Sequence, residues 1–300
     1  MAQGKRRAEG AEIGIIGGSG LYDIEGLTDV REVRAQTPFG RPSDAIITGR
    51  LGTVRVAFLS RHGRGHRLSP TTINYRANIY ALKSLGVRRI ISISAVGSMQ
   101  DTIRPGDVVL PDQFLDWTKR RVSTFFDADV VAHVAFGDPV CPGLGPVLDR
   151  AIRAVGGRVH RGGSYLCMEG PQFSSRAESN LYRSWGVSVI GMTNMPEAKL
   201  AREAELCYVT MALVTDYDCW HETEEAVSVD AILAVLRQNV ALARRVLKEA
   251  IPLLGPPEGC GCSRALQGAI ITDPRAVSGA ARRRLGLLIG NYLPTHTRKA

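Results

Sequence analysis

The chain has 300 residues, of which 44% are hydrophobic and 22% are charged. These values are typical of a globular protein and exclude intrinsically disordered and fibrous classes. No run of eighteen apolar residues is present, and the first ten residues lack the apolar core and cleavage site of a secretory signal. We therefore expect a cytoplasmic protein with no membrane partner.

The net charge of +9 is concentrated near the two ends of the chain. Residues 1–10 carry +2 and residues 256–300 carry +5, which leaves +2 for the 245 residues between them. A nucleic-acid groove requires Lys and Arg gathered on the folded body. We therefore expect no nucleic-acid partner.

Short apolar runs alternate with helical patterns along the chain. Buried strands are predicted over residues 13–16, 54–60, 89–94, 164–168, 187–192 and 207–214. Helices are predicted over 74–85, 144–155, 175–185 and 229–251; the first three each end at a Gly, and Ser175 with Glu178 has the spacing of a capping box. This alternation predicts an α/β layered fold with helices on both faces of the sheet, formed by residues 11–254 as one domain.

The segment Gly-Pro-Pro-Glu-Gly at 255–259 separates this body from a basic C-terminal extension, residues 255–300, with a predicted helix within 273–293. The extension contains Cys260-Gly-Cys262, whose spacing is shorter than that of most zinc sites. Plain thiols are the favoured interpretation, with a local disulfide or a metal site as alternatives. The other cysteines stand singly and are expected to be small buried hydrophobes, so we expect no metal.

Polar side chains follow several of the predicted strands. A Gly-Gly-Ser-Gly loop ends the first strand, Arg and His follow the second, and Ser and Thr lie at the ends of two more. In an open α/β sheet these strand ends bind ligands, and such donors suit an anion. They are Ser19, Arg61, His62, Ser94 and Thr193.

Each motif alone also fits a structural interpretation: a tight turn, a solvated basic loop, or, for Asp216 and Asp218, a helix cap. Together they indicate a phosphate-like anion beside a group that requires carboxylates, because Asp216 and Asp218 follow a further apolar strand.

Several longer strings identify a family resemblance. Residues 13–20, 37–40, 61–64, 169–178 and 215–220 resemble the trimeric class of purine nucleoside phosphorylases, and the resemblance extends over about residues 12–254. It implies a three-layer sandwich with a mixed central sheet, and a pentosyl transfer in which phosphate cleaves a nucleoside. Inorganic phosphate is then a co-substrate, with no other cofactor. After residue 255 the resemblance is weak.

The resemblance also implies a role for each matching residue. Phosphate is expected at Ser19, Arg61, His62, Ser94, Ala95 and Thr193. Substrate contacts are expected from Met192 along the ribose, Phe173 and Ser174 at the purine, Asp216, Tyr217 and Asp218 on its N7 and 6-amino side, and Val229 at the 5′ pocket. His133 matches a position that reaches the substrate of a neighbouring subunit, so a homotrimer or a hexamer is expected.

Asp216 is the expected catalytic residue, because a protonated carboxyl can donate to purine N7 as the base leaves. The acid pair favours adenine, and an apolar 5′ lining favours a methylthio group. The expected reaction is phosphorolysis of 5′-methylthioadenosine to adenine and 5-methylthioribose 1-phosphate, a salvage reaction. The alternatives are a phosphorylase of broader or 6-oxopurine specificity (inosine, methylthioinosine), a hydrolytic nucleosidase, and a non-catalytic nucleoside-binding module.

Overall fold

The computed structural model describes residues 11–18, 20–221, 229–255 and 259–294, the stretch 229–234 by its backbone alone. Within these ranges an 11-stranded mixed sheet forms the centre of the molecule, with one path in the order β2-β3-β4-β1-β5-β10-β9-β7 and a branch from β5 through β11 and β6 to β8. The strands are β1 Ile13–Gly17, β2 Leu27–Val33, β3 Ile46–Leu51, β4 Val54–Ser60, β5 Arg89–Ser98, β6 Val108–Leu110, β7 Gln113–Trp117, β8 Val159–Arg161, β9 Ser164–Met168, β10 Val189–Gly191 and β11 Cys207–Asp216.

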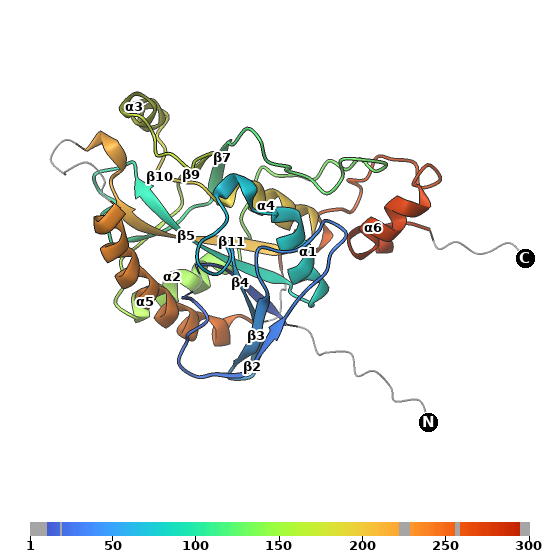
Figure 1. Cartoon of the computed structure of the whole chain (residues 1–300), viewed down its shortest axis with the longest axis horizontal. Helices are drawn as coiled ribbons and strands as arrows, with labels where there is room; N and C mark the ends of the chain where they lie inside the picture. Colours follow the sequence, from blue (N-terminus) through green and yellow to red (C-terminus); the bar gives the residue numbers. More distant parts are fainter. Residues whose placement is uncertain (1–10, 19, 222–228, 256–258, 295–300) are drawn as a thin grey trace, which may run out of the picture.

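Helices cover both faces of the sheet (Figure 1). On one face α1 (Tyr75–Ser84) and α4 (Asn194–Glu203) contribute to one hydrophobic core. On the other face α2 (Leu144–Ala154) and α5 (Val229–Leu253) contribute to a second. The predicted three-layer α/β sandwich with a mixed sheet is confirmed. No helix in the described ranges combines the length and apolar character needed to cross a bilayer.

The predicted helix boundaries have the expected local causes. The Ser175 side chain accepts the N–H of Glu178 while the Glu178 carboxylate accepts the N–H of Ser175, so the capping box opens α3 (Arg176–Ser184) as expected. Gly86, Gly156 and Gly186 follow α1, α2 and α3 with φ of 89°, 79° and 74°, the left-handed conformation that ends a helix.

The central strand β5 forks the sheet. Along one edge it pairs with β11 from Arg89 to Gly97. Along the other it pairs with β1 over Arg89–Ser92 and with β10 only at Gly97 and Ser98. Residues 93–96 therefore have no strand partner on that edge among the described residues. The carboxyl ends of the strands are where open α/β sheets bind ligands, so this unpaired stretch beyond the end of β1 is the candidate site.

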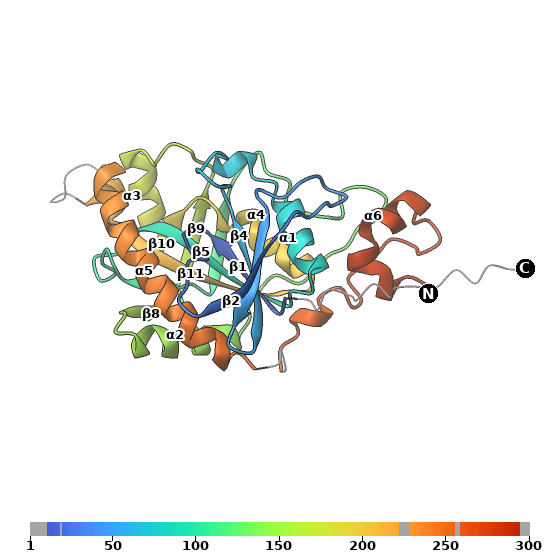
Figure 2. The same cartoon turned by 60° about the horizontal axis from the view of Figure 1, so that its bottom comes forward.

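The C-terminal extension runs from the end of α5 back along the body to α6 (Gly279–Ile289), which lies beside the end of the sheet nearest α1 and α4 (Figure 2). The predicted helix over 273–293 is shorter in the structure, because Ser278 caps the N–H of Ala281 and so starts the helix at Gly279. Backbone bonds join the extension to the segment before α2: His133 N–H donates to Ala269 O at 2.9 Å, and Ile271 N–H donates to Val131 O at 3.0 Å.

Candidate active site

The unpaired edge of β5 is open to solvent at a single residue. The strand is buried from Arg89 to Ser94, whereas Ala95 is exposed and Val96 is buried again. The hydroxyl of Ser94 donates to the Asn194 side-chain oxygen at 3.1 Å, at the start of α4. Ser94 and exposed Ala95, two of the residues that the sequence predicts for an anion, therefore lie on this unpaired edge.

Arg61 lies beneath this opening and is almost completely enclosed by protein. Its Nε donates to Glu197 Oε2 at 2.8 Å, Nη2 donates to Glu197 Oε1 at 3.0 Å and to Ser92 Oγ at 2.7 Å, and Nη1 donates to Ile93 O at 2.8 Å. An Arg side chain has five N–H groups: one on Nε, two on Nη1 and two on Nη2. These bonds use the one on Nε, both on Nη2 and one on Nη1, so they leave one N–H of Nη1. Arg61 is thus held in a buried network, in which Nη2 also donates to Ile16 O at 3.4 Å.

His62 follows Arg61 and lies at the rim. Its Nδ1 bonds to Leu68 O at 2.8 Å, and its ring stacks on that of His66 with centroids 4.2 Å apart. Burial, assisted by the charge of Arg61 and opposed by the bond to Leu68, lowers the pKa of His62 to about 4. At neutral pH the ring is therefore uncharged, with its proton on Nδ1 and an accepting lone pair on Nε2.

Thr193 contributes a buried hydroxyl whose hydrogen bonds are not satisfied within the described part of the chain. It precedes α4, where its side chain makes no cap bond. The Tyr165 hydroxyl beside it also lacks a partner there, and fills the space that a Cβ on Gly191 would occupy. Buried hydroxyls normally have partners, so an unpartnered Thr193 next to Ser94 is consistent with a site that a ligand completes.

Asp216 and Asp218 lie where β11 meets the fork. Asp216 Oδ1 accepts the N–H of Asp218 at 2.8 Å and its Oδ2 accepts the Thr215 hydroxyl at 2.7 Å. Asp218 is buried with φ of 55°, and its Oδ2 accepts the Ser179 hydroxyl at 2.6 Å. Burial raises the pKa of Asp218, against the opposing bond from Ser179.

Gly97 makes this acid pair possible. A Cβ at Gly97 would lie 2.9 Å from Asp216 Oδ1 and 3.3 Å from Asp218 Cβ. Because Gly97 has no side chain, both carboxylates can approach β5 at this position.

Arg121 is a site residue that the sequence analysis missed. Its side chain is 1% exposed, and Nη1 donates to Met192 O at 2.7 Å and to Met195 O at 2.6 Å. Nη2 donates to Glu169 O at 2.7 Å, and the Glu169 carboxylate accepts from Arg121 Nε at 3.3 Å. Arg121 thus joins the ends of β9 and β10. It stands in a loop with no strand-end pattern, so only its buried position reveals it.

Four of the other predicted residues lie on the segments that follow β9, β10 and β11. Ser174 is buried and its carbonyl accepts from the Cys219 thiol, next to Asp218. Met192 packs its sulfur over Gly170, where a Cβ would lie 2.5 Å from it. Phe173 is 56% exposed, on the segment between β9 and α3. The Tyr217 ring stacks on that of His221 with centroids 4.6 Å apart.

Three predicted residues are not placed in this opening. Ser19 lies outside the described residues, and the side chain of Val229, the first residue of α5, is likewise not described. His133 is exposed, on the segment that pairs with the C-terminal extension.

Comparisons with known proteins agree with one another. A model of the phosphorylase superfamily matches residues 12–252. A Geobacter sulfurreducens protein named S-methyl-5′-thioadenosine phosphorylase is 60% identical over 282 residues, covering 94% of this chain and 99% of that protein. A protein of the same name from Thermosynechococcus vestitus is 55% identical, covering 94% and 99%.

Solved structures give the same result. A methylthioadenosine phosphorylase from an Antarctic soil metagenomic library has a TM-score of 0.90 at 52% identity, covering 93% of this chain and 99% of that one. The Schistosoma mansoni methylthioadenosine phosphorylase in complex with tubercidin has a TM-score of 0.78 at 36% identity, covering 86% and 96%.

Proposed function

The chain belongs to the phosphorylase superfamily, and on that premise we propose that it cleaves 5′-methylthioadenosine with inorganic phosphate. The products are adenine and 5-methylthioribose 1-phosphate. The relatives at 60% and 55% identity carry the name of this activity over nearly their whole length.

One observation carries the proposal: groups suited to an anion and a carboxylate suited to a base lie at neighbouring positions along the unpaired edge of β5. Ser94 and exposed Ala95 lie on its open part, with the unpartnered Thr193 hydroxyl nearby. Two residues further along, Gly97 lies against Asp216. An anion held at the first position would face a base held at the second, with the sugar between them.

The reaction forms a bond between a phosphate oxygen and C1′ and breaks the bond from C1′ to N9 of the purine. Positive charge builds on the sugar as the bond lengthens, and the phosphate stabilises it. The proton of hydrogen phosphate balances the adenine anion, which leaves as neutral adenine. The reacting atoms require no metal or organic cofactor.

His62 suits hydrogen phosphate in its neutral form. Its Nδ1 proton is committed to Leu68 O, so Nε2 can accept the P–O–H group. Arg61 adds the remaining N–H of Nη1, and Thr193 adds a hydroxyl that otherwise has no partner in the described structure.

The acid pair supports adenine as the base. Asp216 would donate a proton to N7 as negative charge develops on the leaving purine, and the proton released by hydrogen phosphate would restore it, so that one proton is transferred in all. Its other oxygen would accept from the 6-amino group. Asp218, held by Ser179, fixes the loop through its N–H bond to Asp216. A 6-oxopurine would present a carbonyl to these acceptors and leave them unpaired, at a cost of about 1–3 kcal/mol.

The remaining proposals concern the setting of the reaction. We place the enzyme in the cytoplasm, in keeping with six cysteines that form no disulfide. We also propose a homotrimer, in which exposed His133 of one chain reaches the 5′ group bound by the next.

The test is a substrate panel with and without phosphate. Purified protein should release adenine from 5′-methylthioadenosine only when phosphate is present, and chromatography should show the sugar phosphate in equal amount. Adenine release without phosphate would indicate a hydrolase instead. Faster cleavage of inosine or methylthioinosine would overturn the choice of adenine.

A further inference from the structure

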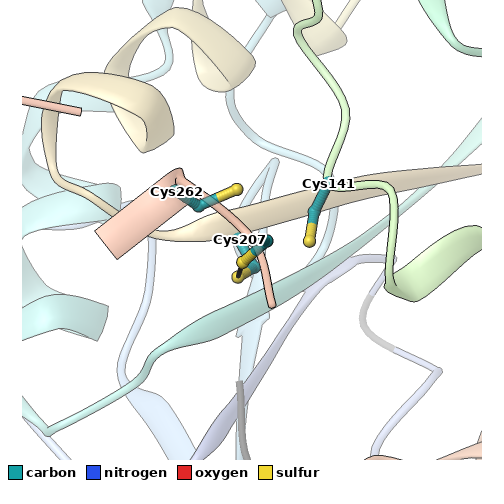
Figure 3. Close-up of side chains that lie close together, drawn as sticks. Cys141, Cys207 and Cys262 are labelled. Atoms are coloured by element: carbon teal, nitrogen blue, oxygen red, sulfur yellow. Dashed lines mark hydrogen bonds between the residues drawn. The ribbon is translucent and has the colours of Figure 1, made fainter. Parts of the chain in front are cut away.

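Four of the six cysteines converge far from the candidate active site. The Sγ atoms of Cys141, Cys207, Cys260 and Cys262 all lie within 4.8 Å of one another, and none of them forms a disulfide. Figure 3 shows the Cys141 and Cys262 side chains pointing their sulfurs into the space around Cys207. Cys141 and Cys207 stand singly in the sequence, which predicts separate buried hydrophobes, but the fold places both beside the Cys-Gly-Cys motif.

The spacing of the sulfurs matches one metal ion. Zinc binds thiolates at about 2.3 Å in a tetrahedron, which places the sulfurs about 3.8 Å apart. The Cys207 and Cys260 sulfurs are 3.4 Å apart, and the limit of 4.8 Å holds for every pair. A four-iron cluster needs a wider cage, because each cysteine binds a different iron atom.

Backbone contacts hold three of the four cysteines in place. Cys141 N–H donates to Tyr208 O at 2.9 Å, which ties the segment before α2 to the start of β11. Cys207 is the first residue of β11, and its N–H donates to Arg88 O at 3.0 Å. Cys262 opens a short 3₁₀ helix over Cys262–Arg264, and this turn lets Cys260 and Cys262 reach the same point despite their close spacing.

A buried cation lies beside the cluster. Arg89 is 3% exposed and is the partner of Cys207 in the register of β5 and β11. It donates to Leu254 O at 3.2 Å and has no carboxylate partner in the described ranges. A buried, unpaired guanidinium is costly, and an anionic group nearby would offset that cost. A zinc ion with four thiolates carries a net charge of −2.

We propose that Cys141, Cys207, Cys260 and Cys262 bind one zinc ion as a structural site with four thiolate ligands. Soft thiolates in a tetrahedron select zinc, and a site closed by four protein ligands leaves no position for a substrate. The site is independent of the proposed reaction, and it departs from the expectation that the chain binds no metal.

The role of the site follows from what it connects. Cys141 and Cys207 belong to the body, whereas Cys260 and Cys262 belong to the C-terminal extension. The extension in turn pairs through Ala269 and Ile271 with the segment that carries His133. Zinc would therefore fasten the extension to the body and keep that segment in place.

The first experiment measures metal and thiols on the same preparation. Full-length protein is expressed without a histidine tag and purified without chelator, and its metals are counted by inductively coupled plasma mass spectrometry. One zinc per chain and six thiols after denaturation with chelator are expected. No metal with six thiols, two thiols with two disulfides, or iron in place of zinc would each overturn the proposal.

The second experiment assigns the ligands. Cys260→Ser and Cys262→Ser should each lower the zinc content at least fivefold, whereas Cys219→Ser, outside the cluster, should retain one zinc per chain. Equal zinc content in all three variants would contradict the assignment.

A third measurement does not depend on the variants folding. Wild-type protein reconstituted with cobalt should show the visible bands and sulfur-to-cobalt charge-transfer absorption of a tetrahedral four-thiolate site. A spectrum with oxygen or nitrogen ligands would exclude the cluster. Removing zinc with a chelator should also speed proteolytic cleavage within residues 255–294, and an unchanged rate would overturn the fastening role.

Discussion

Arg61 and Glu197 form an ion pair with both side chains almost fully buried, 2% and 1% exposed, and Nε lies 2.8 Å from Oε2. The pair joins the end of β4 to α4 directly beneath the open part of β5. The Glu197 carboxylate also accepts the hydroxyls of Ser92 at 2.6 Å and Tyr208 at 2.9 Å. A polar network below the candidate phosphate site therefore connects four elements: the end of β4, α4, β5 and β11.

Replacing Arg61 should damage stability as well as phosphate binding. Arg61→Ala leaves Glu197 as an uncompensated buried charge, which costs about 3–5 kcal/mol of unfolding free energy. Urea unfolding measures this loss, and steady-state kinetics should show that the KM for phosphate rises more than the KM for the nucleoside. Equal changes in the two KM values would count against a role in phosphate binding.

Arg64 provides the matched control for Arg61. It is three residues away, 49% exposed, and paired with Asp44 and Glu32. Arg64→Ala should change stability by only about 0–1 kcal/mol, because exposed ion pairs contribute little.

Arg121 is a positioning residue whose removal should disturb the ribose side of the site. Arg121→Met keeps the length of the side chain but leaves the carbonyls of Met192, Met195 and Glu169 without their donor. We expect kcat/KM for the nucleoside to fall at least tenfold, about 1.4 kcal/mol, with a smaller change in the KM for phosphate. Arg121→Lys should restore part of the activity, since an ammonium can bond to some of these carbonyls.

The exposed neighbour Arg120 serves as the control for Arg121, because its backbone N–H alone bonds to Glu169, at 3.2 Å. Arg120→Met should have close to wild-type kinetics. If Arg121 had a purely structural role, Arg121→Met would lower the free energy of unfolding and leave kcat and both KM values unchanged.

The parts of the fold that were predictable have strong local patterns. β4 and β9 were predicted with their observed bounds because they are continuous apolar runs between turns. β2 and β7 are absent from the prediction because most of their residues are exposed or half-buried, and β6 and β8 because each is an isolated run of three residues. β10 is as short, but it stands within the longer apolar run 187–192. Short or exposed strands are defined by pairing across the sheet, which a linear pattern does not contain.

The same distinction holds for the candidate sites. Ser94, Thr193 and Asp216 are predicted from the sequence because each stands at the end of an apolar run, and strand ends meet at one edge of a sheet. In the structure β5 continues past Ser94 to Ser98. The bonds that hold Arg61 to Glu197 join residues 136 apart in sequence. The four cysteines come from three separate segments, so their meeting could be seen only in the folded chain.

Gly97 should be intolerant of any side chain. Gly97→Ala places a Cβ 2.9 Å from Asp216 Oδ1 and 3.3 Å from Ile190 Cγ2, so the carboxylate has to move. We expect kcat to fall by about 10²-fold, in keeping with misplacement of a catalytic group by about 1 Å, while the fold persists by circular dichroism. In Gly145→Ala, the control, the new Cβ meets nothing within 4 Å on α2, and activity should be unchanged. Full activity in Gly97→Ala would show that the position of Asp216 is not critical.

Asp216 should determine which purine is cleaved. An Asn side chain has an NH₂ group that can donate to N7 and to the carbonyl oxygen of a 6-oxopurine, where a carboxylate can only accept. Asp216→Asn should therefore lower kcat/KM for 5′-methylthioadenosine and raise the ratio of methylthioinosine to methylthioadenosine cleavage by at least tenfold. Ser179→Ala, which alters the support of Asp218 but leaves Asp216 in place, is the control and should keep the wild-type ratio. An unchanged ratio in Asp216→Asn would remove Asp216 from base selection.

His62 should make the free energy of unfolding depend on pH between about 4 and 6.5. Burial lowers its pKa from 6.5 to about 4 in the folded chain, so between these values the unfolded chain binds more protons than the folded one. The free energy of unfolding should therefore have its full value above pH 6.5. It should fall as the pH drops toward 4, by at most about 3 kcal/mol. His62→Asn keeps a donor for Leu68 O but cannot titrate, so urea unfolding at pH 4, 5, 6 and 7 should show a shallower loss in this variant. His133→Asn, at an exposed position, should keep the wild-type slope. Parallel curves for wild type and His62→Asn would mean that the pKa of His62 is the same in the folded and the unfolded chain. The ring would then be charged in the folded protein below pH 6.5, and it could not accept from hydrogen phosphate there.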